Sequence, residues 1–241
     1  MRIAILSDVH SNYHALAPVL ENVRSESPDL VILLGDFFGY YPWAVETYGL
    51  VKQLDAIAIK GNHDALLTAA GSPAPTCWHH ALAEENKRRL QRSTPAALEW
   101  LQQLPLSRTI TCDGLSVHLC HGTPADPANG RYYPDDEAEH AWLPGEGELL
   151  LLGHTHYPLD RRTKSGGLVI NPGSVGQPRD GDLRASWGML DTRTLRFEVR
   201  RTPYDVHRAI RLLEDMAADS RLVHALQKNY PGPLRTCSNA S

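Results

Sequence analysis

The chain has 241 residues, 42% of them hydrophobic, and a formal net charge of −4. This length and apolar content suit one large globular domain over residues 1–241, and the balanced charge gives no electrostatic case for avid binding to nucleic acid or to a membrane surface. No apolar run approaches the roughly 20 residues that a membrane-spanning helix needs, so no membrane partner is expected.

The N-terminal segment MRIAILSD runs directly into a strand pattern and has no cleavage-site signature, so we predict no signal peptide. The cysteines are scattered and form no C-x-x-C pair; they are Cys77, Cys112, Cys120 and Cys237. Free thiols of this kind are typical of a reducing compartment, and a cytoplasmic location is expected.

The first half of the chain alternates strand-like and helix-like segments. Short apolar or β-rich runs occur at Arg2–Leu6, Leu30–Leu34 and Ala56–Ile59. Between them, Tyr13–Ser25 and Ala44–Leu54 have apolar residues at helical spacing. This order predicts a parallel sheet with right-handed crossovers. The next helical segment, His79–Leu104, is interrupted near Pro95, where Thr94 is expected to cap a second helix.

Strand patterns dominate the second half. They occur at Arg108–Cys112, Leu115–Cys120, Leu149–Leu152, Leu168–Ile170, Trp187–Leu190 and Leu195–Arg200. The first two predict a hairpin with Asp113-Gly114 at its turn, and the last two predict another hairpin. Helices are expected at Val206–Met216 and Ser220–Lys228, with frayed residues from Pro231 onward. The long irregular segment Thr123–Gly147 is predicted to be a lid or specificity loop beside the functional site.

Residues of metal-ligand type follow several of these strand-like runs. They are Asp8, His10, Asp36, Asn62, His121, His154 and His156. In extended backbone, residues i and i+2 point the same way, so each D-x-H or H-x-H pair is expected to face one side. Read singly, each residue suits an ordinary turn or cap. Together, carboxylate, imidazole and amide oxygen indicate a hydrolytic centre for phosphate esters with two adjacent divalent metals.

The neighbours of these residues have more ordinary interpretations. His63 would lie beside the metals without having to bind one, and Asp64 is predicted to be a helix N-cap. The adjacent His79 and His80 diverge on a helix and are predicted to be non-ligands. The segment Asn171–Ser174 (N-P-G-S) is predicted to be a plain turn, with a loop that lines the pocket through its amides as the alternative.

The motifs D-V-H, G-D, G-N-H-D, H-G and G-H-T-H occur in this order between residues 8 and 156. In this set and order the chain resembles the calcineurin-like metallophosphoesterase superfamily, and Asn171–Pro178 (N-P-G-S-V-G-Q-P) looks like its small bacterial phosphodiesterase branch. The resemblance implies an α/β fold, a four-layer α/β/β/α sandwich of two mostly parallel or mixed sheets flanked by helices. It also implies one metal held by Asp8, His10, Asp36 and His156, and the other held by Asp36, Asn62, His121 and His154.

The expected cofactors are two divalent metal ions, with manganese first and iron, zinc, cobalt or nickel as alternatives. A hydroxide held between them would attack phosphorus in line, and the catalytic His63 would contact a phosphate oxygen or protonate the leaving alkoxide. The expected function is a phosphodiesterase acting on small or nucleotide phosphodiesters. The alternatives are a phosphomonoesterase, a dinucleoside-polyphosphate hydrolase, or a non-catalytic scaffold, which the complete ligand set disfavours. A homo-oligomer is compatible with the sequence.

The chain departs from the protein Ser/Thr phosphatases that the resemblance includes. Those proteins carry an arginine shortly after the bridging aspartate, whereas Gly35–Tyr40 here reads G-D-F-F-G-Y. Activity on phosphoproteins is therefore disfavoured. An aromatic patch stands there instead: Phe37, Phe38, Tyr40, Tyr41 and Trp43. Part of it is expected to pack in the core, and the rest could stack a nucleobase or an aryl leaving group.

Overall fold

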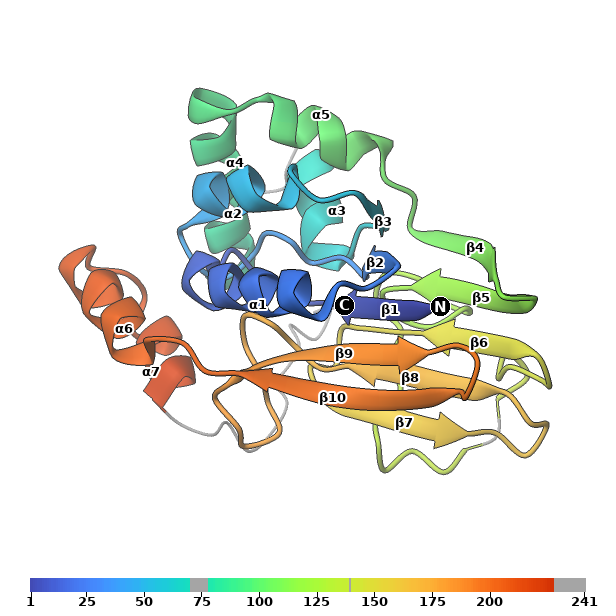
Figure 1. The fold of residues 1–241 in the computed structure, drawn as a ribbon. Helices are drawn as coiled ribbons and strands as arrows, with labels where there is room; N and C mark the ends of the chain where they lie inside the picture. The colour runs from blue at the N-terminus through green and yellow to red at the C-terminus, as the bar shows by residue number, and fades with distance from the viewer. Residues whose placement is uncertain (70–77, 139, 228–241) are drawn as a thin grey trace.

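Two five-stranded sheets form the centre of the molecule (Figure 1). The structure, a computed structural model, describes residues 1–69, 78–138 and 140–227. The first sheet has the order β10-β9-β1-β2-β3, and its strands are β1 (Arg2–Leu6), β2 (Leu30–Leu33), β3 (Ala56–Ala58), β9 (Ala185–Asp191) and β10 (Arg196–Thr202). The second has the order β4-β5-β6-β8-β7, and its strands are β4 (Ser107–Cys112), β5 (Leu115–Cys120), β6 (Glu148–Leu151), β7 (Pro158–Arg162) and β8 (Leu168–Pro172).

The central strand β1 shows why the sequence builds two layers around this sheet. Its residues Ile3 and Ile5 belong to the core between the two sheets, whereas Ala4 and Leu6 belong to the core under the helices. Since successive strand residues point to opposite faces, a strand that is apolar throughout must be covered on both sides. β1 pairs with β2 in parallel and with β9 in antiparallel orientation, so the first sheet is mixed.

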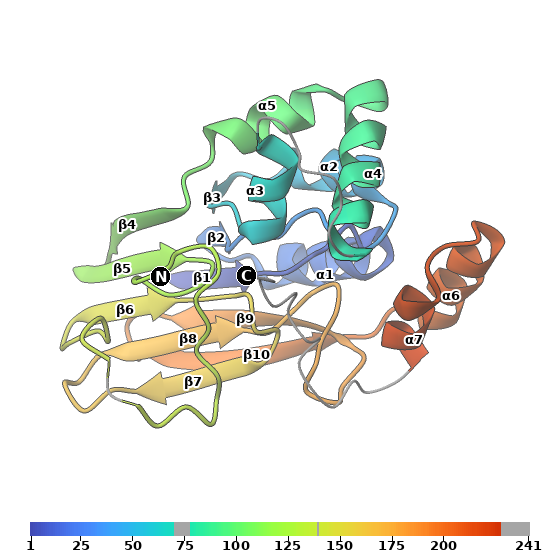
Figure 2. The same cartoon turned by 180° about the vertical axis from the view of Figure 1, so that it is seen from behind.

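Helices cover the outer face of the first sheet, as both views show (Figure 2). They are α1 (Tyr13–Glu26), α2 (Ala44–Val51), α3 (Asn62–Thr68), α4 (Trp78–Ser93) and α5 (Ala96–Gln103). In α1, the Asn12 side chain caps the N-terminus by accepting from Ala15 N at 3.2 Å. The buried stripe of this helix, for example Leu16 and Leu20, packs against the sheet.

The C-terminal helices α6 (Val206–Asp215) and α7 (Ser220–Gln227) lie apart from the sheets, at one side of the molecule in Figure 1. Their buried residues, such as Leu213 and Leu222, share an apolar cluster with Tyr40, Tyr41 and Trp43. The outer face of the second sheet is contacted by the irregular segment 121–147, whose Tyr132 packs with β6, β7 and β8 residues.

The fold class expected from the sequence is confirmed: two mixed sheets with flanking helices in an α/β sandwich. The prediction missed the edge strand β7 and the short helix α3, and it made α2 too long. Thr94 makes no side-chain cap, because α5 begins after Pro95 without one. Of the predicted last helix, Lys228 lies outside the described residues, as do the segment from Pro231 and the cysteines Cys77 and Cys237.

Cys112 and Cys120 are both buried and free. Among residues 1–69, 78–138 and 140–227, no helix has the length and apolar character required to cross a membrane.

Candidate metal centre

The expected site residues all follow strands at one edge of the two sheets; most lie on loops, and Asn62 and His63 lie in the first turn of α3. In the first sheet, β1, β2 and β3 run parallel, so the loops carrying Asp8, Asp36 and Asn62 leave from the same edge. In the second sheet, β5 and β6 are also parallel, and His121 and His154 follow them. Backbone hydrogen bonds tie adjacent loops together, for example His10 N to Asp36 O at 2.9 Å and Gly153 N to His121 O at 2.9 Å.

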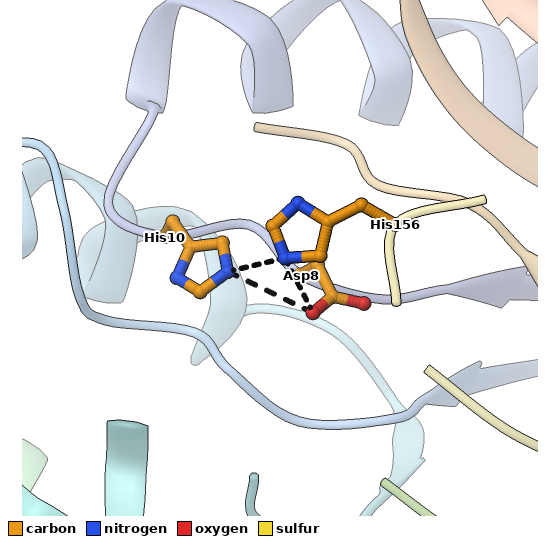
Figure 3. A group of neighbouring side chains, drawn as sticks. All are labelled: Asp8, His10 and His156. Carbon is orange, nitrogen blue, oxygen red and sulfur yellow. Dashed lines mark hydrogen bonds and ion pairs between the residues drawn. The ribbon is translucent and has the colours of Figure 1, made fainter. Parts of the chain in front are cut away.

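One cluster contains Asp8, His10 and His156 (Figure 3). His156 Nε2 lies 3.2 Å from Asp8 Oδ1 and 3.0 Å from His10 Nε2. All three side chains are buried, and their candidate ligand atoms lie within 4.8 Å of one another. Two imidazoles and a carboxylate aimed at one point are a donor set that suits a divalent transition metal.

A second cluster contains Asp36, His121 and His154, and it meets the same 4.8 Å criterion. His121 Nε2 lies 3.1 Å from Asp36 Oδ2. Asp36 Oδ2 is also 3.7 Å from His10 Nε2, which belongs to the first cluster. Asp36 therefore stands between the two clusters, in the position where a carboxylate could bridge two ions.

The ring nitrogens of two histidines are oriented by backbone carbonyls. His121 Nδ1 donates to Leu34 O at 2.8 Å, and His156 Nδ1 donates to Gln177 O at 2.6 Å. Each bond places a proton on Nδ1 and leaves Nε2 as the ring nitrogen that faces the cluster. This arrangement fixes the tautomer that a metal ligand requires.

The site loops use left-handed backbone rather than extended backbone. Positive φ values occur at Asp8 (55°), His10 (50°), Asp36 (54°), His154 (66°) and His156 (65°). The expectation that Asp8 and His10 converge because extended residues i and i+2 align is therefore wrong in its geometry. The side chains nevertheless converge, and His154 and His156 serve different clusters. Such strained conformations persist where the surroundings hold them, commonly at functional sites.

Glycines permit the close approach of these loops. A Cβ at Gly61 would clash with the Asp36 side chain, and a Cβ at Gly153 would clash with Ser7 Oγ and come within 3.0 Å of Asp8 Oδ2. Only glycine therefore fits at these two positions without moving a candidate ligand.

The ionisation of the site is set by burial and by the crowded charges. Burial opposes charge on Asp8 and Asp36, but nearby histidines outweigh it and hold both pKa values below the usual range. Burial also works against charge on His121, yet Asp36 and Asp8 raise its pKa to about 10. His154 and His156 have pKa values lowered by burial to about 3 and about 4, with the charge of Arg179 contributing at His156.

Several buried polar atoms of the site fit metal coordination, because they make no hydrogen bond within the described part of the chain. They are Asp8 Oδ1, Asn62 Oδ1, His121 Nε2 and His154 Nε2. A buried polar atom without a hydrogen bond is costly. The carboxylate oxygen, the amide oxygen and the two imidazole nitrogens are also the ligand types that hard and borderline divalent ions prefer. The residues present thus fit a pair of divalent metals.

His63 lies at the edge of both clusters. Its backbone N–H donates to Asp36 Oδ1 at 2.9 Å, and its ring stands 4.9 Å from the His10 ring, centroid to centroid. His10, Asp36 and His63 form a third group that meets the same ligand-distance criterion. The geometry therefore accommodates His63 both as a proton donor and as a ligand.

Residues that were predicted to be structural hold the site together. Asp64 is not the N-cap of α3, because the helix begins at Asn62; its carboxylate accepts from Gly61 N at 3.0 Å and Phe38 N at 3.2 Å. It thereby joins the loops that carry Asp36 and Asn62. Burial and the charge of Asp36 raise the pKa of Asp64 to about 7.

The N-P-G-S segment is not a turn throughout, because Asn171 and Pro172 end strand β8 and the backbone becomes left-handed only at Gly173, with φ 76°; the segment also fixes the G-H-T-H loop. Asn171 Nδ2 donates to Gly153 O at 2.7 Å and to Thr155 Oγ1 at 3.2 Å. Ser174 Oγ donates to Asp8 O at 2.7 Å. Neither sequence interpretation anticipated this role. The signal was present in the polar residues that flank the Pro-Gly pair.

The aromatic patch is packed rather than open. Phe37 and Phe38 belong to the core under the helices, and Tyr41 and Trp43 pack against α6 and α7. The Tyr40 ring lies 4.3 Å from the His10 ring and 5.6 Å from the Trp78 ring. None of the five patch residues has more than 7% of its surface exposed. They therefore offer no open face to a nucleobase.

Two cavities adjoin the site. The larger, of about 670 Å³, is lined by Trp78, by Gln177 to Arg179 and by residues of α6 and α7. The smaller, of about 370 Å³, is lined by Asn62, His80, Ala128 and Asn129 among others. The larger cavity is bordered by Gln177, whose carbonyl accepts from His156 Nδ1, and the smaller is bordered by the candidate ligand Asn62. His80 belongs to none of the ligand groups found in the described residues, and the side chain of His79 lies outside them.

The irregular segment 123–147 has two parts. Its beginning contributes Ala128 and Asn129 to the smaller cavity. Further along, it is tied to β7, since Arg161 donates to the Tyr132 hydroxyl at 2.7 Å and to the carbonyls of Pro134 and Asp136. Its predicted role as a lid or specificity loop stays a prediction, for which only the first part has the right position.

Comparison with known proteins agrees with the fold. A family model described as the calcineurin-like phosphoesterase superfamily domain matches residues 1–195. The uncharacterized protein MJ0912 of Methanocaldococcus jannaschii is 29% identical over 221 residues, which are 86% of this chain and 89% of that protein.

Solved structures show the same architecture. The metallophosphoesterase from Sphaerobacter thermophilus is 28% identical, with a TM-score of 0.75 over 95% of this chain and 99% of that one. Hypothetical protein PH1004 from Pyrococcus horikoshii has a TM-score of 0.79 at 21% identity, over 96% of this chain and 99% of that one. Since the family model covers most of its length, the chain belongs to the calcineurin-like phosphoesterase superfamily, whose members hydrolyse phosphate esters.

Proposed function

We propose that the protein is a phosphodiesterase that acts on small phosphodiesters with two divalent metal ions, manganese being preferred. The observation that carries the proposal is the position of Asp36 between two buried ligand clusters. Metals bound there would supply Lewis acidity and a nucleophile at neutral pH. Asp8, His10, Asp36 and His156 would hold one ion, and Asp36, Asn62, His121 and His154 would hold the other.

The chain's own residues would orient the substrate and move a proton. His63, whose ring lies beside His10 and Tyr40, would protonate the leaving oxygen. His121 and His156, each fixed through Nδ1, would keep Nε2 directed at the metals. Asp64 and Asn171 would keep the loops at the spacing that the two clusters need.

Preference for diesters is supported by the two cavities. A phosphodiester carries two organic substituents on one phosphorus, and two separate cavities border Gln177, the partner of His156, and the candidate ligand Asn62. A monoester would leave one of these spaces unused. The free thiols Cys112 and Cys120 fit the predicted cytoplasmic location, which stays a prediction.

The test is turnover on a substrate panel after chelation and addition of defined metals. We expect bis(p-nitrophenyl) phosphate to be hydrolysed with Mn²⁺ and to be preferred over p-nitrophenyl phosphate. A preference for the monoester would favour a phosphomonoesterase. Selective cleavage of dinucleoside polyphosphates would favour a dinucleoside-polyphosphate hydrolase. Metal binding without turnover of any ester would identify a non-catalytic scaffold.

A further inference from the structure

The larger cavity contains an arginine that the proposed chemistry does not use. Arg179 is half-buried in the cavity wall. Among the described residues, the one hydrogen bond of its side chain is long, from Nη2 to the Tyr40 hydroxyl at 3.4 Å. Within the described residues it forms no ion pair with a carboxylate. The neighbouring Arg184 and Arg201, by contrast, are both paired with aspartates.

The position of Arg179 connects the cavity with the metal centre. Its partner Tyr40 packs against the rings of His10 and His63. Two residues before Arg179, Gln177 lines the same cavity and accepts the hydrogen bond from His156 Nδ1. Through Tyr40, Arg179 is one residue removed from the rings of His10 and His63, so a long substituent on a phosphorus held at the clusters would reach it.

The rest of the lining suits an organic group with negative charge. Pro178, Ala217, Ala218 and Val223 provide apolar wall, and His224 adds a protonatable group. Glu214, the acidic residue in the described lining, is exposed on α6. Trp78 is already covered by Tyr40 and Arg221, so ring stacking is not the main recognition available here. The volume of about 670 Å³ lies in the range of ligand sites.

We infer that this cavity is a subsite for a substrate substituent that carries a second anionic group, and that Arg179 determines this specificity by binding that group. The inference rests on the proposed phosphodiesterase function, whose substrate class it narrows. A planar guanidinium with several donors is well suited to phosphate or carboxylate. The cost of holding it without a carboxylate partner would be offset when such a substrate binds.

The experiment compares two chromogenic diesters that differ by one charged group. They are thymidine 5′-(p-nitrophenyl phosphate) and the same ester with a 3′-phosphate. We expect wild-type kcat/KM to favour the 3′-phosphorylated ester, mainly through KM, and Arg179→Gln to reduce this preference by about tenfold or more. Arg179→Lys, which keeps the charge but loses the planar fork, should retain part of it.

Two controls separate anion binding from other effects. Arg162→Gln removes one positive charge from β7, the edge strand of the second sheet. This change should not alter the preference for the 3′-phosphorylated ester. Tyr40→Phe removes the hydrogen-bond partner of Arg179 while leaving the guanidinium, so the preference should remain. The inference is overturned if Arg179→Gln leaves the preference intact, if Arg162→Gln abolishes it equally, or if Tyr40→Phe reproduces the loss.

A binding measurement separates this inference from the proposed function. Thymidine 3′,5′-bisphosphate is titrated calorimetrically into chelator-treated protein, and we expect Arg179→Gln to weaken its binding by about tenfold. If Arg179→Gln weakens binding in this way but neither ester is hydrolysed with any metal, the subsite is supported and the proposed phosphodiesterase function is rejected. Metal-dependent turnover with a preference insensitive to Arg179 would keep the function and reject the subsite.

Discussion

At the scale of single residues, Asp36 has the most central position in the site. One of its oxygens accepts from His63 N, and the other faces His121 and His10. Asp36→Asn keeps the shape but removes the charge, so we expect metal-dependent turnover to fall by roughly 10³-fold or more, because several kcal/mol of charge stabilisation is lost. Steady-state kinetics and elemental analysis test this. Near-normal kcat with full metal content would contradict the bridging role.

His63→Ala separates two roles that the geometry accommodates. If the imidazole donates a proton, turnover should fall by about 10²- to 10⁴-fold while both metals remain bound. Metal content measured on the purified variant is the deciding quantity. A His63→Ala protein that has lost metal would show that the group of His10, Asp36 and His63 is a ligand set and that the catalytic assignment is wrong.

The charge state of His121 predicts that metal binding releases a proton. Its pKa is raised from 6.5 to about 10 by Asp36 and Asp8, against the effect of burial, so it is protonated at pH 7 without metal. The stabilisation from this ion pair is fully present below about pH 6.5 and is lost as pH rises through about 10. Metal binding at pH 7 should therefore release about one proton, and affinity should increase toward higher pH.

Calorimetry in buffers of different ionisation enthalpy measures the released proton. His121→Gln should remove this release, whereas His154 and His156, whose pKa values are already low, should contribute little. Release that persists unchanged in His121→Gln would place the proton on another group.

At the scale of elements, strand and helix types followed well from the sequence where apolar periodicity was strong. β1 and α1 were predicted almost to the residue, because both bury a regular apolar pattern. β7 was missed since it reads P-L-D-R-R, a polar edge strand beginning with proline. α3 was missed because seven residues give too short a pattern to recognise.

The sequence of the site loops predicted the chemistry of their side chains better than it predicted their backbone conformation. The residue types at the site were readable from the sequence, but the left-handed backbone at Asp8, Asp36 and His154 was not. Asp, Asn and His tolerate this conformation better than most residues, yet they adopt it only where neighbouring loops hold them. Those contacts join residues more than a hundred positions apart, as His154 N to Asp8 Oδ2 does.

The end of strand β8, where Asn171 lies, provides a test of loop support. Asn171→Asp preserves the acceptor for Gly173 N but places an oxygen against the carbonyl of Gly153. We expect a loss of about 2–3 kcal/mol in the free energy of unfolding, together with reduced turnover, because a buried donor becomes an acceptor. Urea denaturation measures the first effect. The matched change Asn22→Asp is at an exposed residue whose bond to Thr202 is only partly buried, so it should cost much less; an equal cost would refute the support role.

At the scale of the whole molecule, the proposed ligands come from both sheets. Loops of the first sheet carry Asp8, His10, Asp36 and Asn62, and loops of the second carry His121, His154 and His156. Bound metals would tie the two layers together and bind only the folded state. We expect Mn²⁺ at about 100 times its Kd to add about 2.7 kcal/mol of stability. Thermal denaturation with metal and with chelator tests this, and an unchanged Tm would contradict it.

The wide separation of the site residues in the chain has a consequence for biosynthesis. Asp8 and His10 leave the ribosome first, yet His156 and the Gln177 carbonyl that orients it are made well over a hundred residues later. A nascent chain that ends before β6 holds only an incomplete donor set and no means to fix the last imidazole. Metal binding at the proposed centre would therefore follow synthesis of nearly the whole polypeptide, as a late step of maturation rather than a nucleus for folding.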